Sequence, residues 1–443
     1  MEDMKVRVVE SSFVAPSERT PRKGLWLVRA CSLDLLIAKR GHTPTFYLFH
    51  NNDAASDFFD VARLKAAMAK ALVAFYPLAG RLGVDSSGRV EIDCNGKGAL
   101  FVVARADDIT IDEIKDVKPS PELRRQLVPR IEPSSVVMGV QVTFFKCGGV
   151  ALGTALHHAS IDLIRVPTID ATSAFHFFQT WSALSRDGDH AAVELPCHDR
   201  TLLRARSPPI IHPDALSMFH PKLTFSNPSG PITTQVFSIS KDQVTSLKRG
   251  CGGASTFCAL SALVWRCACA ARRLPPDVEA RLTFSANIRR RVTPPLPERY
   301  FGNAYLRVGV AATVQDVIAP QALASVAGRI GGAIRRMDDE MVRSAIDYFE
   351  AEEMSGHWAA TGTRPMTELH VTSWLGMPVY DADFGWGPPL VMSRAESNLG
   401  GFVHLVSDGP AYGGGGVRVI TCMEAANVKE LEHLLYQDLA RCI

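Results

Sequence analysis

Two adjacent histidines, His157 and His158, end the apolar stretch "VALGTALHH" at residues 150–158. Strand side chains alternate between faces, so His158 continues the row of Leu152 and Leu156, while His157 points the opposite way. A neutral imidazole at a strand end can accept a proton near pH 7. His158 is therefore a candidate general base, and a core histidine bonded to the backbone is the alternative.

Two aspartates follow in similar settings. Asp162 lies four residues after His158, and Asp170 directly precedes a helical pattern, where aspartate is a favourable N-cap. A metal site built from these groups is not expected, because neighbouring histidines diverge on a strand. Cys267 and Cys269 form a lone C-x-C, so no zinc site is expected there either.

The elements that must position these residues follow both α and β periodicity. Apolar residues at helical spacing predict helices within 60–78 and 172–185. Alternating patterns predict strands over 136–145 and 150–158, joined by a glycine turn. Near the C-terminus, residues 415–439 read as a strand followed by a helix.

With 443 residues the chain is too long for one ordinary core, and two domains are expected. A stretch rich in proline and serine predicts a crossover linker over 196–232, between domains at 1–195 and 233–443. The four glycines at 413–416 precede a strand rather than a helix, which favours a hairpin loop over a phosphate loop.

Composition excludes several classes of function. The net charge of +2 gives no basis for nucleic-acid binding. No run of about 18 apolar residues is present, so no membrane span is expected. The ten cysteines lie scattered in apolar segments, as is typical of reduced thiols in a cytoplasmic protein.

Two separated motifs give these features a family context. "HASID" at 158–162 and "DFGWG" at 383–387 resemble the paired H-x-x-x-D and D-F-G-W-G motifs of the plant BAHD acyltransferases. The resemblance covers essentially the whole chain and is strongest to the hydroxycinnamoyltransferase branch. Further segments that look like family segments are 75–82, 94–102, 200–209, 264–274, 299–306 and 371–387.

The resemblance implies a mixed α/β fold. It consists of two similar chloramphenicol-acetyltransferase-like domains with mixed sheets, joined by a long crossover loop, with an active-site tunnel between them. The activity implied is acyl transfer from a coenzyme A thioester, which is a co-substrate rather than a bound cofactor. We expect a monomer that needs no metal and whose partners are small molecules.

The family mechanism implies a role for each motif residue. His158 would deprotonate the acceptor, and general-base catalysis is typically worth about 10²–10⁴-fold in rate. The Thr372 hydroxyl and the Trp374 indole N–H would stabilise the tetrahedral oxyanion, with core packing as the alternative for Trp374. The segment with Asp383, Gly385 and Trp386 would fix a loop rather than touch substrate.

The motif aspartate would pair with an arginine, here Arg289, instead of relaying protons to the histidine. In the family it leads almost at once into a helix, whereas this chain has about eight extra residues at 163–170. Spacing favours Asp162 for the role, and adjacency to the helix favours Asp170. The insert either bulges harmlessly or impairs catalysis, since a displacement of about 1 Å at such a site can cost on the order of 10² in rate.

The acceptor is expected to be an amine. Members that use shikimate or quinate carry an arginine where this chain has Gly376, and a buried carboxylate would lack its bidentate partner. The segment with Leu375 and Met377 is similar to members that acylate agmatine, putrescine, tyramine or tryptamine, which belong to phenolamide biosynthesis. His42 is expected to line the same pocket. A neutral alcohol acceptor is the alternative.

Coenzyme A carries phosphates that require cations or helix N-termini. Candidate residues for these contacts, with exposed solvated surface as the alternative, are Lys248, Arg249, Ser255 and Thr256.

Overall fold

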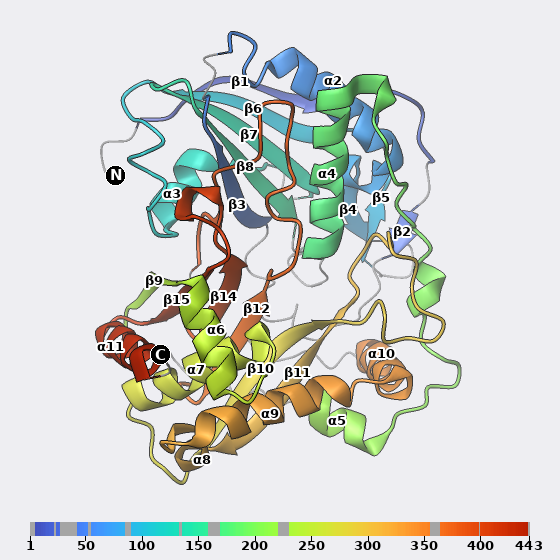
Figure 1. The fold of residues 1–443 in the computed structure, drawn as a ribbon. Coiled ribbons are helices and arrows are strands. Elements are labelled where there is room, and N and C mark those ends of the chain that lie inside the picture. The colour runs from blue at the N-terminus through green and yellow to red at the C-terminus, as the bar shows by residue number, and fades with distance from the viewer. Residues whose placement is uncertain are drawn as a thin grey trace.

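The computed structural model describes residues 5–21, 24–26, 42–51, 55–84, 90–132, 135–157, 169–219, 230–354, 364–397 and 399–441. Strands and helices intermix along the chain and build two large sheets, one in each half of the molecule (Figure 1). This arrangement confirms the expected mixed α/β class. No helix within the described ranges is long and apolar enough to cross a membrane.

The first large sheet contains six strands in the order β1-β6-β7-β8-β3-β13. Its β6–β7 pair is parallel and its other pairs are antiparallel. The strands are β1 Arg7–Val14, β3 His42–Phe49, β6 Ala99–Ala106, β7 Met138–Phe145, β8 Val150–His157 and β13 Val391–Arg394.

Two long helices, α2 (Val61–Ala74) and α4 (Ala171–Asp187), cover one face of this sheet (Figure 1). The Trp181 indole of α4 donates to the Leu64 carbonyl of α2 over 2.9 Å, which fixes the two helices side by side. The remaining elements of this half are α3 Pro121–Leu127, the 3₁₀ helices Tyr76–Ala79 and Gly188–His190, and a small sheet of β2 Gly24–Trp26, β4 Arg81–Val84 and β5 Val90–Asp93.

The second large sheet follows the order β11-β10-β12-β14-β15-β9. Its strands are β9 Ile232–Ile239, β10 Glu279–Asn287, β11 Tyr305–Thr313, β12 Glu368–Ser373, β14 Phe402–Ser407 and β15 Val417–Glu424. The helices of this half are α6 Lys241–Gly250, α7 Thr256–Ala271, α8 Val314–Ile318, α9 Ala322–Arg335, α10 Asp339–Met354 and α11 Val428–Arg441, with a 3₁₀ turn at Pro410–Tyr412.

The two halves share structure across their boundary. Strand β13 comes from the C-terminal half, yet it pairs with β3 and completes the first sheet. Trp374, Phe384 and Met392 belong to the same hydrophobic cluster as the α2 and α4 residues. The region 233–443 therefore supplies part of the N-terminal core, which the expected domain limits did not anticipate.

The expected linker over 196–232 contains local structure. It includes a 3₁₀ helix at Arg200–Leu203 and the helix α5 (Pro213–Phe219). Arg206 donates to Asp347 over 2.7 Å and to Glu340 over 2.9 Å, so the segment is anchored to α10 of the C-terminal half.

Candidate active site

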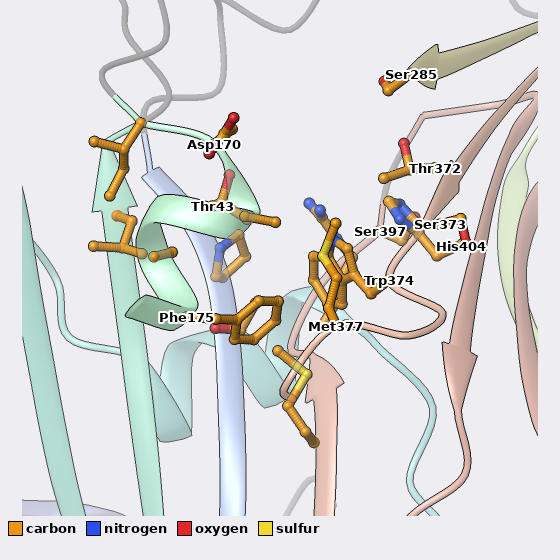
Figure 2. A pocket seen from close by; sticks show the side chains of 18 of the residues that line it. Thr43, Asp170, Phe175, Ser285, Thr372, Ser373, Trp374, Met377, Ser397 and His404 are labelled. Atoms are coloured by element: carbon orange, nitrogen blue, oxygen red, sulfur yellow. The ribbon is translucent and has the colours of Figure 1, made fainter. Parts of the chain in front are cut away.

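A cavity lies between the two sheets and takes its lining from both (Figure 2). Thr43, Asp170 and Phe175 stand on one side of it, and Thr372 and Trp374 stand on the other. Further lining residues used below are His42, Thr45, Tyr47, Arg124, Leu156, His157, Phe178, Ser285, His370, Met377, Met392, Arg394, Glu396 and His404.

His157 is the last residue of β8 and lines this cavity with a side chain that is almost fully buried. Its backbone N–H donates to the Val137 carbonyl over 2.8 Å. Its ring stands edge-on to that of His42, with 4.6 Å between centroids. The sequence analysis chose His158 because it placed His157 on the other face, but His157 is the described histidine that reaches the cavity from β8.

His42 is held as a neutral imidazole. Its Nε2–H donates to the Val136 carbonyl over 2.7 Å, which leaves Nδ1 as an acceptor. Burial lowers the pKa of His42 to about 4, with Arg124 adding a smaller effect in the same direction. His42 is among the residues that line the cavity, and its contact with the acceptor stays a prediction.

His158 and Asp162 lie outside the described residues, as does the insert from residue 163 to 168. The insert ends inside the fold, because Ile169 and Asp170 are both buried.

Asp170 holds the position that the sequence analysis favoured for Asp162, namely the partner of Arg289. Both guanidinium nitrogens of Arg289 donate to the Asp170 carboxylate, over 2.7 and 3.0 Å, and the pair is buried. Asp170 also caps α4 by accepting from the Ser173 N–H and accepts from the Ala304 N–H. The aspartate therefore joins the start of α4 to the C-terminal half.

The oxyanion candidates lie at the end of β12. Thr372 and Trp374 both line the cavity. The Trp374 backbone N–H donates to the Leu405 carbonyl over 2.8 Å, and its ring stands edge-on to Phe175 of α4 at 5.9 Å. Trp374 thus packs between the two halves and contributes to the cavity wall as well.

The three pocket residues expected after Trp374 are separated by a turn. Met377 lines the cavity. Leu375 instead packs against the core of the C-terminal half, and Gly376 is exposed with φ +72°. Leu375 and Gly376 are not among the described lining residues of the cavity, so their contact with the acceptor stays a prediction.

Charged residues in the lining are few, and sequence reasoning missed most of them. Arg124 of α3 and Glu396 form an ion pair over 2.7 Å. Arg394, the last residue of β13, lines the same cavity half-buried, and its Nε–H donates to the Glu396 carbonyl over 3.3 Å. The only sequence signal for these residues was a charged position next to the short apolar run at 390–392.

The coenzyme A candidates are not among the described lining residues of the cavity. Lys248 and Arg249 occupy the last turn of α6. Ser255 caps α7 by accepting from the Cys258 N–H, and Thr256 is the first residue of that helix. These four residues lie at the corner between the end of α6 and the start of α7. Their contact with a coenzyme A phosphate stays a prediction.

The D-F-G-W-G segment is built as a folded loop. The Asp383 carboxylate accepts from the N–H groups of Gly385 and Gly387 over 2.8 and 2.9 Å. The Trp386 ring stacks on Phe59 and lies under the Arg63 guanidinium. Neither Asp383 nor Trp386 is among the described lining residues of the cavity.

The C-x-C pair lies inside helix α7. Cys267 and Cys269 are buried, and burial raises the pKa of the Cys269 thiol to about 12. Within the described ranges, no three acidic, histidine or cysteine side chains come together as a metal site would require.

Known proteins resemble this chain along its length. A family model described as "Transferase family" matches residues 4–438. Putrescine hydroxycinnamoyltransferase 1 of Oryza sativa subsp. japonica is 42% identical, over 98% of this chain and 100% of the relative. Shikimate O-hydroxycinnamoyltransferase of Nicotiana tabacum is 35% identical with the same coverage.

The fold is also found among solved structures. F. sporotrichioides TRI101, solved in complex with coenzyme A and T-2, superposes with a TM-score of 0.73 over 93% of this chain and 97% of that one. The two sequences are 15% identical, so this similarity concerns the fold alone.

Proposed function

Because the chain belongs to the Transferase family, the BAHD acyltransferases, and its relatives are hydroxycinnamoyltransferases, we propose that it transfers a hydroxycinnamoyl group from coenzyme A to an amine. The observation that carries the proposal is that His157 of the first sheet and Thr372 and Trp374 at the end of β12 line one cavity. General-base catalysis of acyl transfer requires a base on one side of the reacting carbonyl and hydrogen-bond donors on the other.

We infer that His157 is the base. An amine with a pKa of about 10 arrives protonated and must lose that proton before it can attack. When the neutral amine bonds to the thioester carbon, its nitrogen becomes positively charged. His157 accepts one proton from that nitrogen. The C–S bond then breaks, and the proton passes from the imidazolium to the departing thiolate, which gives amide and free coenzyme A.

The negative charge formed on the carbonyl oxygen needs donors. The Thr372 hydroxyl and the Trp374 indole are our candidates for that role, since both line the wall formed by the C-terminal sheet. Removing one such donor typically costs about 10²–10³ in kcat.

The choice of an amine rests on the segment after Trp374. Gly376 occupies the position where the resemblance places the arginine of shikimate- and quinate-using members, and it is exposed. The Oryza relative is named for putrescine, and the Nicotiana relative is named for an alcohol acceptor, so O-acyl transfer is the alternative.

Among amines, the described lining favours one with a single positive charge. Its two carboxylates, Asp170 and Glu396, are both engaged by arginines. A diamine such as putrescine, or agmatine, would find no unengaged carboxylate among the described lining residues. Apolar side chains such as Phe175, Phe178 and Met377 suit tyramine or tryptamine better.

The proposal is tested by supplying p-coumaroyl-CoA with a panel of amines and a panel of neutral alcohols. Thiol release and product mass are measured for agmatine, putrescine, tyramine and tryptamine in parallel with the alcohols. Amide products with faster turnover for amines are the expected result. Ester formation without amide formation would favour the alternative, and no thiol release with any acceptor would contradict acyl transfer by this chain.

A further inference from the structure

Within the cavity, Arg394 differs from every other charged lining residue that the structure describes. Asp170 is paired with Arg289, and Glu396 with Arg124. No described carboxylate lies within ion-pair distance of Arg394, whose hydrogen bond to the Glu396 backbone carbonyl uses only Nε. The two terminal nitrogens of the guanidinium, which form the donor fork, are left for another acceptor.

Strand register places Arg394 on the face of the sheet that α4 covers. Arg394 pairs with Thr45 of β3, and directly opposed residues of an antiparallel pair point to the same face. Tyr47, two residues further along β3, shares that face and contacts the Phe178 ring of α4 at 5.7 Å. Arg394 therefore points towards the same space as α4.

The surroundings of Arg394 are poor in water. Met392, Phe175 and Phe178 line the cavity and bury most of their surface. A guanidinium in such a setting is costly without an anion and interacts strongly with one when it arrives. Its planar fork matches a carboxylate in two parallel hydrogen bonds.

We propose that Arg394 forms an acceptor subsite for a carboxylate, so that the preferred acceptor is an amine that also carries a carboxylate. The inference rests on the proposed function, because it assumes that the acceptor enters this cavity. Arg394 lies at the end of β13 and not in the segment after Trp374, so this subsite is distinct from the position that Gly376 occupies.

The register also sets the length of the acceptor. His157 pairs with His42, which lies three residues along β3 from Thr45, the partner of Arg394. With strands about 4.8 Å apart and a rise of about 3.3 Å per residue, the Cα atoms of His157 and Arg394 lie about 14 Å apart. Three residues is an odd offset, so the side chains of His157 and Arg394 leave the sheet on opposite faces and reach the cavity from different sides. Amine and carboxylate must therefore be separated by several bonds, which excludes an α-amino acid.

Three acceptors of equal chain length isolate the terminal charge. These are ε-aminocaproate, hexylamine and hexamethylenediamine, which end in a carboxylate, a methyl group and an ammonium. Each is assayed with p-coumaroyl-CoA, and its binding to the protein saturated with coenzyme A is measured by calorimetry. For the unmodified protein we expect kcat/KM to be highest for the aminocarboxylate and lowest for the diamine.

Substitution of Arg394 should remove this order. Arg394→Gln is expected to lower kcat/KM for ε-aminocaproate about 10- to 100-fold. The same substitution should change kcat/KM for hexylamine less than about 3-fold. Arg394→Lys, which keeps the charge but not the fork, should give an intermediate value. Arg130→Gln is the matched control, because Arg130 is highly exposed on the surface and is paired with the exposed Glu132.

Each outcome decides the inference. Equal kcat/KM for the three acceptors, or an equal loss for all three in Arg394→Gln, would overturn the carboxylate subsite. If Arg394→Gln does not fold, the charge series on the unmodified protein and Arg394→Lys give the answer. Failure to acylate any amine would count against the proposed function instead, while the calorimetric comparison would still decide whether Arg394 selects the carboxylate.

Discussion

At the scale of single residues, the bidentate pair between Asp170 and Arg289 has the clearest energetic consequence. Both side chains are buried, and Arg289 also donates to the carbonyls of Tyr300 and Gly302. Removing one partner leaves an uncompensated buried charge, which typically costs about 3–5 kcal/mol. The pair is thus a fixed joint between the start of α4 and the C-terminal half.

The first prediction compares the two aspartates. Asp170→Asn should lower the free energy of unfolding by about 3 kcal/mol or more, whereas Asp162→Asn should change it by less than about 0.5 kcal/mol. Denaturant unfolding of both variants measures this. Equal destabilisation by the two substitutions would mean that Asp162 shares the structural role.

The second prediction concerns His42 and pH. The unfolded chain protonates this histidine near pH 6.5, while the folded chain does so only near 4. The unfolded state therefore binds more protons between these values, so stability is full above about pH 6.5 and falls as the pH drops towards 4.

His42→Gln should flatten part of that pH dependence, by about 1–3 kcal/mol between pH 7 and pH 4. It should not flatten all of it, because burial also lowers the pKa of His198 to about 4. Unfolding free energies measured at several pH values test this. An unchanged slope in the variant would show that His42 is protonated normally in the folded protein.

At the scale of elements, the insert between β8 and α4 is the feature that separates this chain from the family pattern. The structure anchors both sides of it, with His157 at the end of β8 and Asp170 at the cap of α4. Removing residues 160–168 leaves "HHAID", in which three residues separate His157 from Asp170. This deletion restores H-x-x-x-D spacing without touching either anchor.

The third prediction follows from the H-x-x-x-D spacing that this deletion restores. A chain lacking 160–168 should fold and transfer the acyl group at least as fast as the unmodified protein. A chain lacking 163–170 should lose stability, because Asp170 goes with it. Thermal unfolding and thiol release are measured for both. Activity retained only by the second deletion would contradict the assignment of Asp170.

Secondary structure in this region was largely predictable from the sequence. Which aspartate pairs with Arg289, and which histidine at the end of β8 lines the cavity, were not. The alternation in β8 and the apolar spacing of α4 were read correctly, because both are local patterns. The pairing of Asp170 with Arg289 could not be read from local patterns, since Arg289 lies 119 residues further along the chain. Alternation also directed attention to His158, because it cannot tell where the cavity opens at the end of a strand.

At the scale of the whole molecule, the cavity exists because the two sheets meet. Trp374, directly after β12, packs on Phe175 from α4, and β13 crosses to join the first sheet. The general architecture could be expected from the family resemblance. The Arg394 and Glu396 lining could not, because both become part of the cavity only through the long-range pairing of β13 with β3.

The fourth prediction concerns coenzyme A. If the α6–α7 corner holds its phosphates, Lys248→Gln combined with Arg249→Gln should raise KM for p-coumaroyl-CoA several-fold and leave kcat nearly unchanged. The effect should shrink at high ionic strength, where exposed charges are screened. A loss of kcat at unchanged KM would place the donor site elsewhere.

The central claim is that His157 is the base that activates the acceptor, and a comparison of two variants tests it most directly. Turnover of p-coumaroyl-CoA with tyramine is measured for His157→Ala and His158→Ala, after thermal unfolding has shown that both fold. We predict that His157→Ala loses about 10²–10⁴-fold in kcat and that His158→Ala stays within about 10-fold of the unmodified protein. Full activity in His157→Ala, with loss in His158→Ala, would contradict the account.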